Sequence, residues 1–375
     1  MGSYRVISSD SHILEPPDLW SSRIEPQFRD HAPRVIHRAE DHTDWWVCEG
    51  IKGASGGSGG DKAGQRFEEP EKVTFAGAFE DIRPGSYMPA EHLNDMELDG
   101  VTASVIYPSQ GLLVYSVPDT DLLSAICRAY NNWLAEFCQP FPHGLRGIAM
   151  LNLDDVQDGI TELTRCAKMG LAGGMITVSS PPHRPYDAPE YEPLWAAAQD
   201  LGMPLSLHVG TNRTGPHDPA LDVEDIPPAF FTNIDHWVRM SLSQMLFGGV
   251  FERYPKLQVV SVEQELSWAP HFLNRLDNTY TQRPRARSQR PLKAGMLPSD
   301  YFHTNVFLSF QEDALGIRDR HIIGVDNLMW GSDYPHPEGT FPRSQQILEE
   351  ILAECTEEEK SKIAGGNAAR VYHID

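Results

Sequence analysis

The sequence carries acidic and histidine side chains at four places where an apolar run gives way to polar residues. Asp10 and His12 follow the first such run, His208 and Glu263 end two runs near the middle, and Asp333 follows the last. Carboxylate oxygens and imidazole nitrogens are common ligands of divalent cations, and they also serve as general acids and bases. These residue types therefore indicate metal or acid–base chemistry, provided that the fold brings the four places together.

Each group taken alone has an ordinary structural explanation. Asp10 and His12 are two residues apart, so an extended backbone points both side chains to one face, but such a triplet is also usual in turns and helix caps. His208 lies among apolar neighbours and is compatible with a core histidine. Asp333 is a candidate N-cap for the helix that follows it, and Glu263 is a candidate for an ion pair with a nearby Lys or Arg.

Eight β-rich runs alternate with longer helical patterns along the chain, and most of these runs are continuously apolar, as in parallel strands buried on both faces. The predicted strands are residues 4–9, 103–107, 146–151, 174–178, 204–209, 257–262, 305–310 and 328–332. The predicted helices are residues 119–137, 154–169, 189–201, 235–254, 265–280, 314–323 and 343–353. This order predicts an α/β fold of the (β/α)8 TIM-barrel type. Since such a barrel gathers the carboxyl ends of its strands around one axis, a shared metal ion becomes the favoured interpretation.

The boundaries and the excess length are also predicted from local signals. Asp119 and Asp154 are candidate N-caps, and Gly170 and Gly202 stand where helices should end. We expect one domain over residues 1–375 with an insertion at about residues 21–90. This insertion contains Trp45, Trp46 and a Gly/Ser-rich stretch at 53–60, which is either a surface loop or a lid over the site.

Composition excludes several classes of protein. The chain has 375 residues, of which 31 are Lys or Arg and 53 are Asp or Glu, so its formal net charge is 31 − 53 = −22. A surface this acidic repels phosphate backbones, so we expect no nucleic-acid partner. The one basic run comprises Arg283, Arg285, Arg287, Arg290 and Lys293, and it is either a solvated loop or a docking segment for substrate or another subunit.

The cysteines and the hydropathy pattern give an expectation about location. Five cysteines occur without CxxC spacing, which favours a reducing compartment. No apolar run approaches the ~20 residues that a membrane span requires, and the N-terminus carries no export signal. We therefore expect a cytoplasmic protein that has no membrane partner.

Several segments resemble a known enzyme family. They are VISSDSH at 6–12, LHVG at 207–210, YPKL at 254–257, WGSDYPH at 330–336 and GNAARVY at 366–372. The chain is similar to the amidohydrolase-related family. This branch of the amidohydrolase superfamily includes aminocarboxymuconate-semialdehyde decarboxylase and several nonoxidative aromatic-acid decarboxylases. The resemblance covers nearly the whole chain and is specific for the fold and the metal site.

The resemblance implies that a divalent metal ion is held by Asp10, His12, His208 and Asp333. The first strand carries an acidic-x-His pair in place of the superfamily's usual HxH, and Glu263 stands where many relatives carry a histidine. Dinuclear members have a bridging Lys at the end of the fourth strand, but residues 176–180 include no Lys, which favours a single ion. Two nitrogens and two carboxylate oxygens suit Zn²⁺, and Mn²⁺ also tolerates this share of oxygen.

Two reactions of a small, aromatic carboxylate or carbonyl substrate are compatible with this implied site. In hydrolysis, an activated water attacks a carbonyl while Asp333 takes the water's proton and passes it to the leaving group. In nonoxidative decarboxylation, Asp333 protonates the ring carbon and carbon dioxide leaves. Glu263 is the candidate second acid or base. A third interpretation is a barrel with a vestigial metal site that acts as a binding or structural subunit.

Further residues are candidates for substrate contacts, each with a simpler alternative. Arg213 is a candidate clamp for a substrate carboxylate, or a surface loop residue. His336 and His236 are candidate hydrogen-bond donors around the metal ligands, and Trp20 is a candidate wall of an aromatic pocket or a core residue. We also expect a homo-oligomer, for which the helical run 236–251 supplies an apolar face, although the same face could pack on the barrel.

Overall fold

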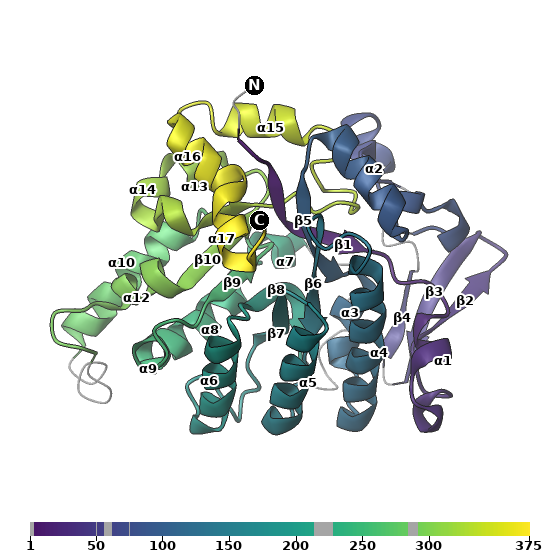
Figure 1. Cartoon of the computed structure of the whole chain (residues 1–375), viewed down its shortest axis with the longest axis horizontal. Coiled ribbons are helices and arrows are strands. Elements are labelled where there is room, and N and C mark those ends of the chain that lie inside the picture. Colours follow the sequence, from purple (N-terminus) through teal and green to yellow (C-terminus); the bar gives the residue numbers. More distant parts are fainter. Residues whose placement is uncertain (1–3, 50, 56–61, 75, 214–227, 284–291) are drawn as a thin grey trace.

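Eight parallel strands form one curved sheet at the centre of the molecule (Figure 1). The computed structural model describes residues 4–49, 51–55, 62–74, 76–213, 228–283 and 292–375. The sheet order is β1-β5-β6-β7-β8-β9-β10-β11, so each strand pairs with the next one along the barrel. Its strands are β1 Ile7–Ile13, β5 Ala103–Pro108, β6 Leu145–Met150, β7 Gly173–Ser179, β8 Leu205–Asn212, β9 Val259–Val262, β10 Val306–Phe310 and β11 Leu328–Trp330. The predicted (β/α)8 barrel is therefore confirmed.

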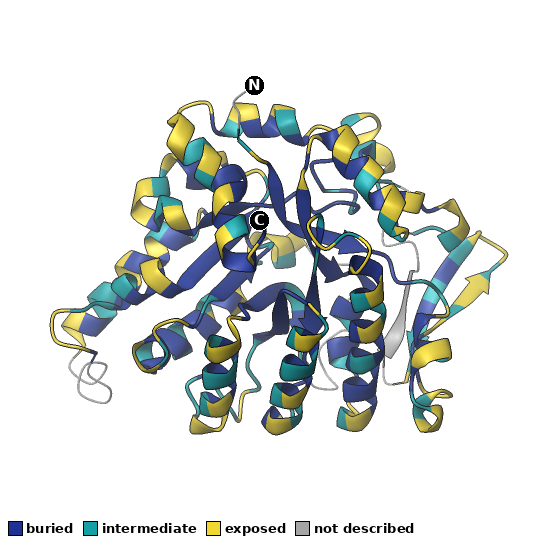
Figure 2. Ribbon diagram, viewed as in Figure 1, coloured by how far each residue is buried: buried dark blue, intermediate teal, exposed yellow. Residues whose placement is uncertain are grey.

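Helices surround the sheet and cover its outer face. They are α1 Leu19–Arg23, α2 Pro89–Asp99, α3 Gln110–Leu113, α4 Thr120–Cys138, α5 Val156–Lys168, α6 Glu192–Leu201, α7 Pro228–Thr232, α8 His236–Phe247, α9 Val250–Arg253, α10 Ala269–Gln282, α12 Pro298–Asn305, α13 Ala314–Arg318, α14 Arg320–Ile323, α15 Ser344–Ile351, α16 Glu357–Ser361 and α17 Asn367–Tyr372. Figure 2 shows buried residues along the barrel strands and exposed residues on the outer sides of the helices, as an amphipathic helix on a barrel requires.

Several predicted boundaries are wrong. The first strand, predicted at 4–9, is Ile7–Ile13, and the helix predicted at 265–280 is Ala269–Gln282. Three further helix predictions fail for local reasons. The helix predicted at 235–254 is two helices, because Gly249 adopts a φ of 67° and the chain turns between α8 and α9. The helix predicted at 314–323 is likewise divided into α13 and α14. The N-cap of α5 is Asp155, whose side chain accepts hydrogen bonds from the backbone N–H groups of Gln157 and Asp158. The predicted cap, Asp154, forms an ion pair with Arg213 instead.

The insertion contains a second, smaller sheet. Strands β2 Arg34–Arg38, β3 Thr43–Cys48 and β4 Ile51–Ser55 are antiparallel, in the order β2-β3-β4. The buried Trp46 of β3 meets Trp20 edge to face, with ring centroids 5.3 Å apart, so this sheet is anchored to the barrel's helical layer. Most of the Gly/Ser-rich stretch at 53–60 and most of the basic run at 283–293 lie outside the described residues, and a lid there stays a prediction.

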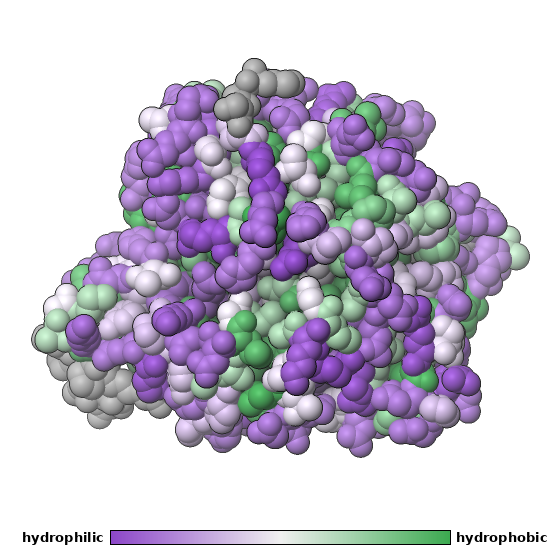
Figure 3. Space-filling view, viewed as in Figure 1, coloured by the Kyte–Doolittle hydropathy of each residue, from purple (hydrophilic) through white to green (hydrophobic). Residues whose placement is uncertain are grey.

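The surface agrees with the acidic composition. Figure 3 shows a face on which hydrophilic side chains surround smaller hydrophobic areas. The five cysteines are all free thiols. Within the described part of the chain, no helix combines the length and the apolar character needed to cross a membrane.

The barrel closes where β11 meets β1, and Gly331 makes this contact tight. Asp333 N–H donates to the Asp10 carbonyl at 2.8 Å, and His12 N–H donates to the Tyr334 carbonyl at 2.6 Å. A Cβ on Gly331 would lie 2.7 Å from Asp10 Cβ and 3.0 Å from Asp10 N. Only glycine lets the two strand ends approach this closely, and the approach brings Asp10 beside Asp333.

We therefore expect Gly331→Ala to weaken both the fold and the site. The added methyl group forces β1 away from β11, which should lower the free energy of unfolding by about 1–3 kcal/mol. Thermal unfolding and metal titration of the same protein measure the two effects. Unchanged values for both would contradict the role of this contact.

Candidate metal centre

Five predicted side chains gather in the barrel: Asp10 and His12 lie within β1, His208 lies within β8, and Glu263 and Asp333 come shortly after β9 and β11. His12 Nε2 lies 3.4 Å from Asp10 Oδ1 and 3.4 Å from Asp333 Oδ1. His208 Nε2 lies 3.3 Å from His12 Nε2, 3.6 Å from Asp10 Oδ1 and 3.6 Å from Glu263 Oε2. These donor atoms converge from strands that are distant in sequence, as the barrel geometry predicts.

The two histidines are held in the tautomer that a metal ligand needs. His12 Nδ1 lies 2.8 Å from the Pro108 carbonyl, and His208 Nδ1 lies 2.9 Å from the Val209 carbonyl. A carbonyl only accepts, so each Nδ1 donates, and Nε2 is the ring nitrogen that faces the cluster. Burial also lowers the pKa of His12 to about 3, which keeps this imidazole neutral.

Two buried carboxylate oxygens in the cluster accept no hydrogen bond from the described residues. They are Asp10 Oδ1 and Asp333 Oδ2, on side chains that are at most 2% exposed. A buried, unpartnered carboxylate oxygen is costly unless a cation lies beside it. Asp10, His12, His208 and Glu263 offer ligand atoms that all lie within 4.8 Å of one another, and this set of nitrogen and oxygen donors fits a divalent metal ion.

The backbone of Glu263 and Asp333 adopts a strained conformation that orients their carboxylates. Glu263 has a φ of 61° and Asp333 a φ of 55°, both in the left-handed region that residues other than glycine rarely adopt. Each residue comes shortly after its strand, β9 or β11, so the left-handed turn sends the carboxylate inward over the barrel axis. Strain of this kind persists where the surrounding structure determines it, and it clusters at functional sites.

Two carboxylates of the cluster, Asp333 and Glu263, have raised pKa values. Burial raises the pKa of Asp333 well above its ordinary value, and the charges of Glu338 and Asp10 add to this effect, while Gln311 opposes it. Burial likewise raises the pKa of Glu263, with further contributions from Asp333 and Asp10. Several acidic groups therefore lie close together without a cationic side chain of the described residues among them, and a bound cation would balance their charge.

His336 joins the cluster as predicted, and Ser109 and Glu338 were missed. His336 Nδ1 lies 2.9 Å from Asp333 Oδ1, and its ring stacks on that of His12 with centroids 4.1 Å apart. His336 Nε2 is 3.0 Å from the Ser109 hydroxyl, directly after β5, where inspection of every strand end would have found it. Glu338 approaches Asp333 and Glu263 from the loop after β11, and only its proximity to Asp333 in sequence hinted at this role.

Arg213 occupies a structural position. Its guanidinium makes a bidentate pair with Asp154 and also donates to the carbonyls of Tyr115 and Val117. These four contacts to protein atoms occupy most of the guanidinium N–H groups, so few remain to bind a substrate carboxylate. The arrangement favours a clamp between the loops after β8 and β6, and the predicted substrate contact stays a prediction.

Replacing Arg213 separates these two interpretations. The Arg213 and Asp154 side chains are only 13% and 23% exposed, so Arg213→Met leaves a poorly solvated carboxylate and should lower the free energy of unfolding by about 3 kcal/mol. Urea unfolding measures this, with Arg318→Met as the control because that side chain is 66% exposed. A higher KM with unchanged stability would instead establish a substrate contact.

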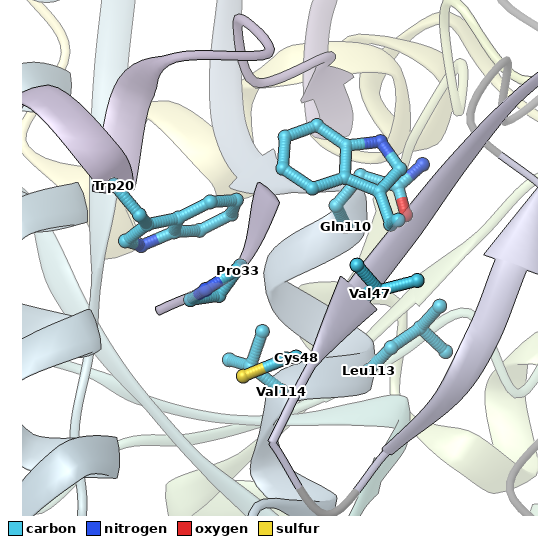
Figure 4. A pocket seen from close by; sticks show the side chains of 8 residues that line it. Trp20, Pro33, Val47, Cys48, Gln110, Leu113 and Val114 are labelled. Atoms are coloured by element: carbon cyan, nitrogen blue, oxygen red, sulfur yellow. The ribbon is translucent and has the colours of Figure 1, made fainter. Parts of the chain in front are cut away.

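Trp20 lies deep in the wall beside the insertion sheet. Its side chain is fully buried, and its indole N–H donates to the Ile126 carbonyl at 3.1 Å. It borders a small, mainly apolar cavity of about 20 Å³ (Figure 4), lined by Trp20, Pro33, Trp46, Val47, Cys48, Gln110, Leu113 and Val114. A contact of Trp20 with substrate stays a prediction. His236 lies elsewhere, in a cavity of about 300 Å³ between α8 and α10 that none of the metal-centre residues lines.

The match to a family model decides the family. Residues 83–374 match the model described as amidohydrolase. The chain belongs to the amidohydrolase family. This family assignment agrees with the resemblance in the sequence motifs, and the matched region contains His208, Glu263 and Asp333.

Relatives and solved structures agree with this family and fold. The gamma-resorcylate decarboxylase of Rhodococcus jostii (strain RHA1) is 28% identical over 286 residues, which cover 70% of this chain and 80% of that protein. An amidohydrolase of Mycobacterium avium subsp. paratuberculosis K-10 has a TM-score of 0.79 at 21% identity, covering 99% of both chains. A dihydroxybenzoic acid decarboxylase of Polaromonas sp. JS666, with bound manganese and 2-nitroresorcinol, has a TM-score of 0.64 at 18% identity, covering 99% of this chain and 97% of that one.

Proposed function

We propose that this amidohydrolase-family chain is a metal-dependent carboxy-lyase that removes carbon dioxide from a small aromatic carboxylate without oxidation. The observation that carries the proposal is that Asp10, His12, His208 and Glu263 offer ligand atoms that all lie within 4.8 Å of one another, while Asp333 Oδ1 lies 3.4 Å from His12 Nε2. The decarboxylases among its relatives supply the substrate class. Hydrolysis of a carbonyl compound is the second candidate, because the same ligands and the same proton carrier serve both reactions.

In this proposal, Asp10, His12, His208 and Asp333 hold the metal ion. When bound, a divalent ion supplies Lewis-acid polarisation of a substrate oxygen. The donor set accommodates Zn²⁺ or Mn²⁺, and the manganese of the Polaromonas protein makes Mn²⁺ the first metal to test. Elemental analysis of the purified protein distinguishes the two ions.

Asp333 is the proposed proton carrier. Its carboxyl group lies at the centre of the cluster and contacts His336, which fixes its orientation. A protonated Asp333 gives its proton to the ring carbon, the bond to the carboxylate carbon breaks, and its electron pair stays with the ring as carbon dioxide leaves. Glu263, 3.6 Å from His208 Nε2, is the proposed second acid or base that exchanges the proton with solvent.

Product analysis in heavy water tests the proposal. We expect the metal-loaded protein to release carbon dioxide from one member of a hydroxybenzoate panel and to place one deuterium on the vacated ring carbon. Incorporation of ¹⁸O from labelled water into an acid product would establish hydrolysis instead. A protein that carries no stoichiometric metal and transforms no compound of either class would support the vestigial barrel.

The remaining expectations concern assembly and location. Trp237 and Met240 on α8 are 40% and 49% exposed, which supports a homo-oligomer that uses the predicted 236–251 face. We also propose that the protein is cytoplasmic and acts on a small molecule. Light scattering of the Met240→Asp variant tests the assembly, because a charge on this face should yield monomers.

A further inference from the structure

One buried carboxyl group lies close in sequence to the metal ligands but is not among them. Glu15 follows β1 by two residues and is 1% exposed. Its Oε2 accepts a hydrogen bond from the Gln110 N–H and its Oε1 from the Gly111 N–H, each at 2.9 Å. Among the described residues, no Lys, Arg or His side chain pairs with it. Burying a carboxyl group without a cation is costly, so these two backbone contacts must account for its presence.

Glu15 makes a contact that Ser109 would ordinarily make. Gln110 and Gly111 are the first residues of α3, and Ser109 stands at the N-cap. A serine there usually accepts a backbone N–H of the first turn, but the Ser109 side chain makes no such bond. Its hydroxyl lies instead 3.0 Å from His336 Nε2. Glu15 therefore satisfies the start of α3 from a position 95 residues earlier in the chain, and the Ser109 hydroxyl is left to hold His336.

The segment that this carboxyl group holds, residues 108–111, also fixes a metal ligand. The Pro108 carbonyl lies 2.8 Å from His12 Nδ1, so it orients the imidazole ring. The segment is tightly packed, because a Cβ on Gly111 would lie 2.6 Å from Pro108 Cβ and 2.8 Å from Met150 Sδ. In so close a packing, a displacement of the Gly111 N–H also displaces Pro108 and the imidazole that it holds.

We propose that Glu15 is a positioning residue of the metal centre, which acts through residues 108–111 on His12 and on His336. Its action on His12 sets the affinity for the metal ion. Its action on His336, whose Nδ1 lies 2.9 Å from Asp333 Oδ1, sets the rate of proton transfer, a point that rests on the proposed function. Replacing a residue that only orients a metal ligand typically costs 10–100-fold in metal affinity or activity.

Metal titration separates a positioning role from an ordinary contribution to stability. Chelator-treated samples of the unchanged protein, Glu15→Gln and Glu15→Met are titrated with MnCl2 by calorimetry. Glutamine keeps one acceptor oxygen and replaces the other by an amide nitrogen that cannot accept, whereas methionine removes both acceptors. We expect the affinity for Mn²⁺ to fall about 10-fold in Glu15→Gln and further in Glu15→Met.

The control is Glu162→Gln, which alters a buried carboxylate of the outer helical layer. Glu162 lies on α5 and accepts hydrogen bonds from Asn131 Nδ2 at 2.7 Å and from Arg165. This variant should lose thermal stability and keep its affinity for Mn²⁺. An equal loss of affinity in Glu162→Gln overturns the proposal, and so does an unchanged affinity in the folded Glu15 variants. Glu15→Gln is nearly isosteric, so it decides the question if Glu15→Met does not fold.

Kinetics at saturating MnCl2 tests the action on His336. Glu15→Gln and Ser109→Ala should each lower kcat about 10-fold with little change in KM, and Ser109→Ala should leave the affinity for Mn²⁺ unchanged. An unchanged kcat in both variants overturns this part of the proposal. If the unchanged protein decarboxylates nothing, the proposed function fails and the titration still decides the role of Glu15. An active decarboxylase whose metal affinity and kcat do not depend on Glu15 would give the reverse result.

Discussion

Replacement of Asp333 by asparagine should lower kcat/KM for the decarboxylated substrate by about 10³-fold, within the range measured for positioned acids and bases. Asparagine has nearly the same shape but cannot carry the proton or the negative charge. Its amide can still accept the hydrogen bond from His336, so the fold should be retained. Steady-state kinetics on protein with measured metal content gives the result.

The control for this substitution is Asp200→Asn, an exposed carboxylate at the end of α6. It should leave kcat/KM unchanged. An Asp333→Asn enzyme that retains its metal and loses less than tenfold in kcat/KM would show that the proton comes from another group. Glu263, the other buried acid of the cluster, would then be the first candidate.

Replacement of His208 by alanine should weaken metal binding by at least about 10²-fold, because losing even a residue that only orients a ligand costs 10–100-fold. His208 Nε2 lies within 3.6 Å of Asp10, His12 and Glu263, so no neighbouring side chain can take its place without moving. A ligand that binds only the folded state stabilises it, so a 100-fold weaker metal removes about 2.7 kcal/mol of stability at the same metal concentration.

Thermal unfolding with and without a chelator measures this second effect. The unchanged protein should lose stability when the metal is removed, whereas His208→Ala should respond little to the chelator. His143→Ala, an exposed histidine, is the matched control. An equal chelator response in His208→Ala and in the unchanged protein would exclude His208 as a ligand.

The barrel could be predicted from sequence because most of its strands are continuous apolar runs. A strand buried on both faces has few polar positions, and all eight such runs are strands of the sheet. The insertion sheet could not be found in this way, since β2 is largely exposed and includes Arg34 and Arg38. The break between α8 and α9 depends on the backbone conformation of Gly249, which apolar spacing does not reveal.

The site residues that belong to strands could be predicted from the sequence. The site residues that lie in loops could not. Asp10, His12 and His208 belong to strands whose ends meet in any barrel of this type. Glu338 reaches the cluster through a loop whose path no periodic signal describes. The contact between Arg213 and Asp154 joins two loops 59 residues apart, so the sequence suggested a substrate contact instead.

The left-handed backbone at Glu263 and Asp333 implies that stability and catalytic activity make opposite demands at these positions. A residue without Cβ adopts such a conformation freely, so glycine at either position would relieve a penalty on the order of 1–3 kcal/mol while discarding the carboxylate. Selection for thermal stability alone should therefore favour glycine at these two positions, which would give a more stable but inactive protein. An acid at each of these two positions therefore indicates that the carboxylates are needed for activity rather than for stability.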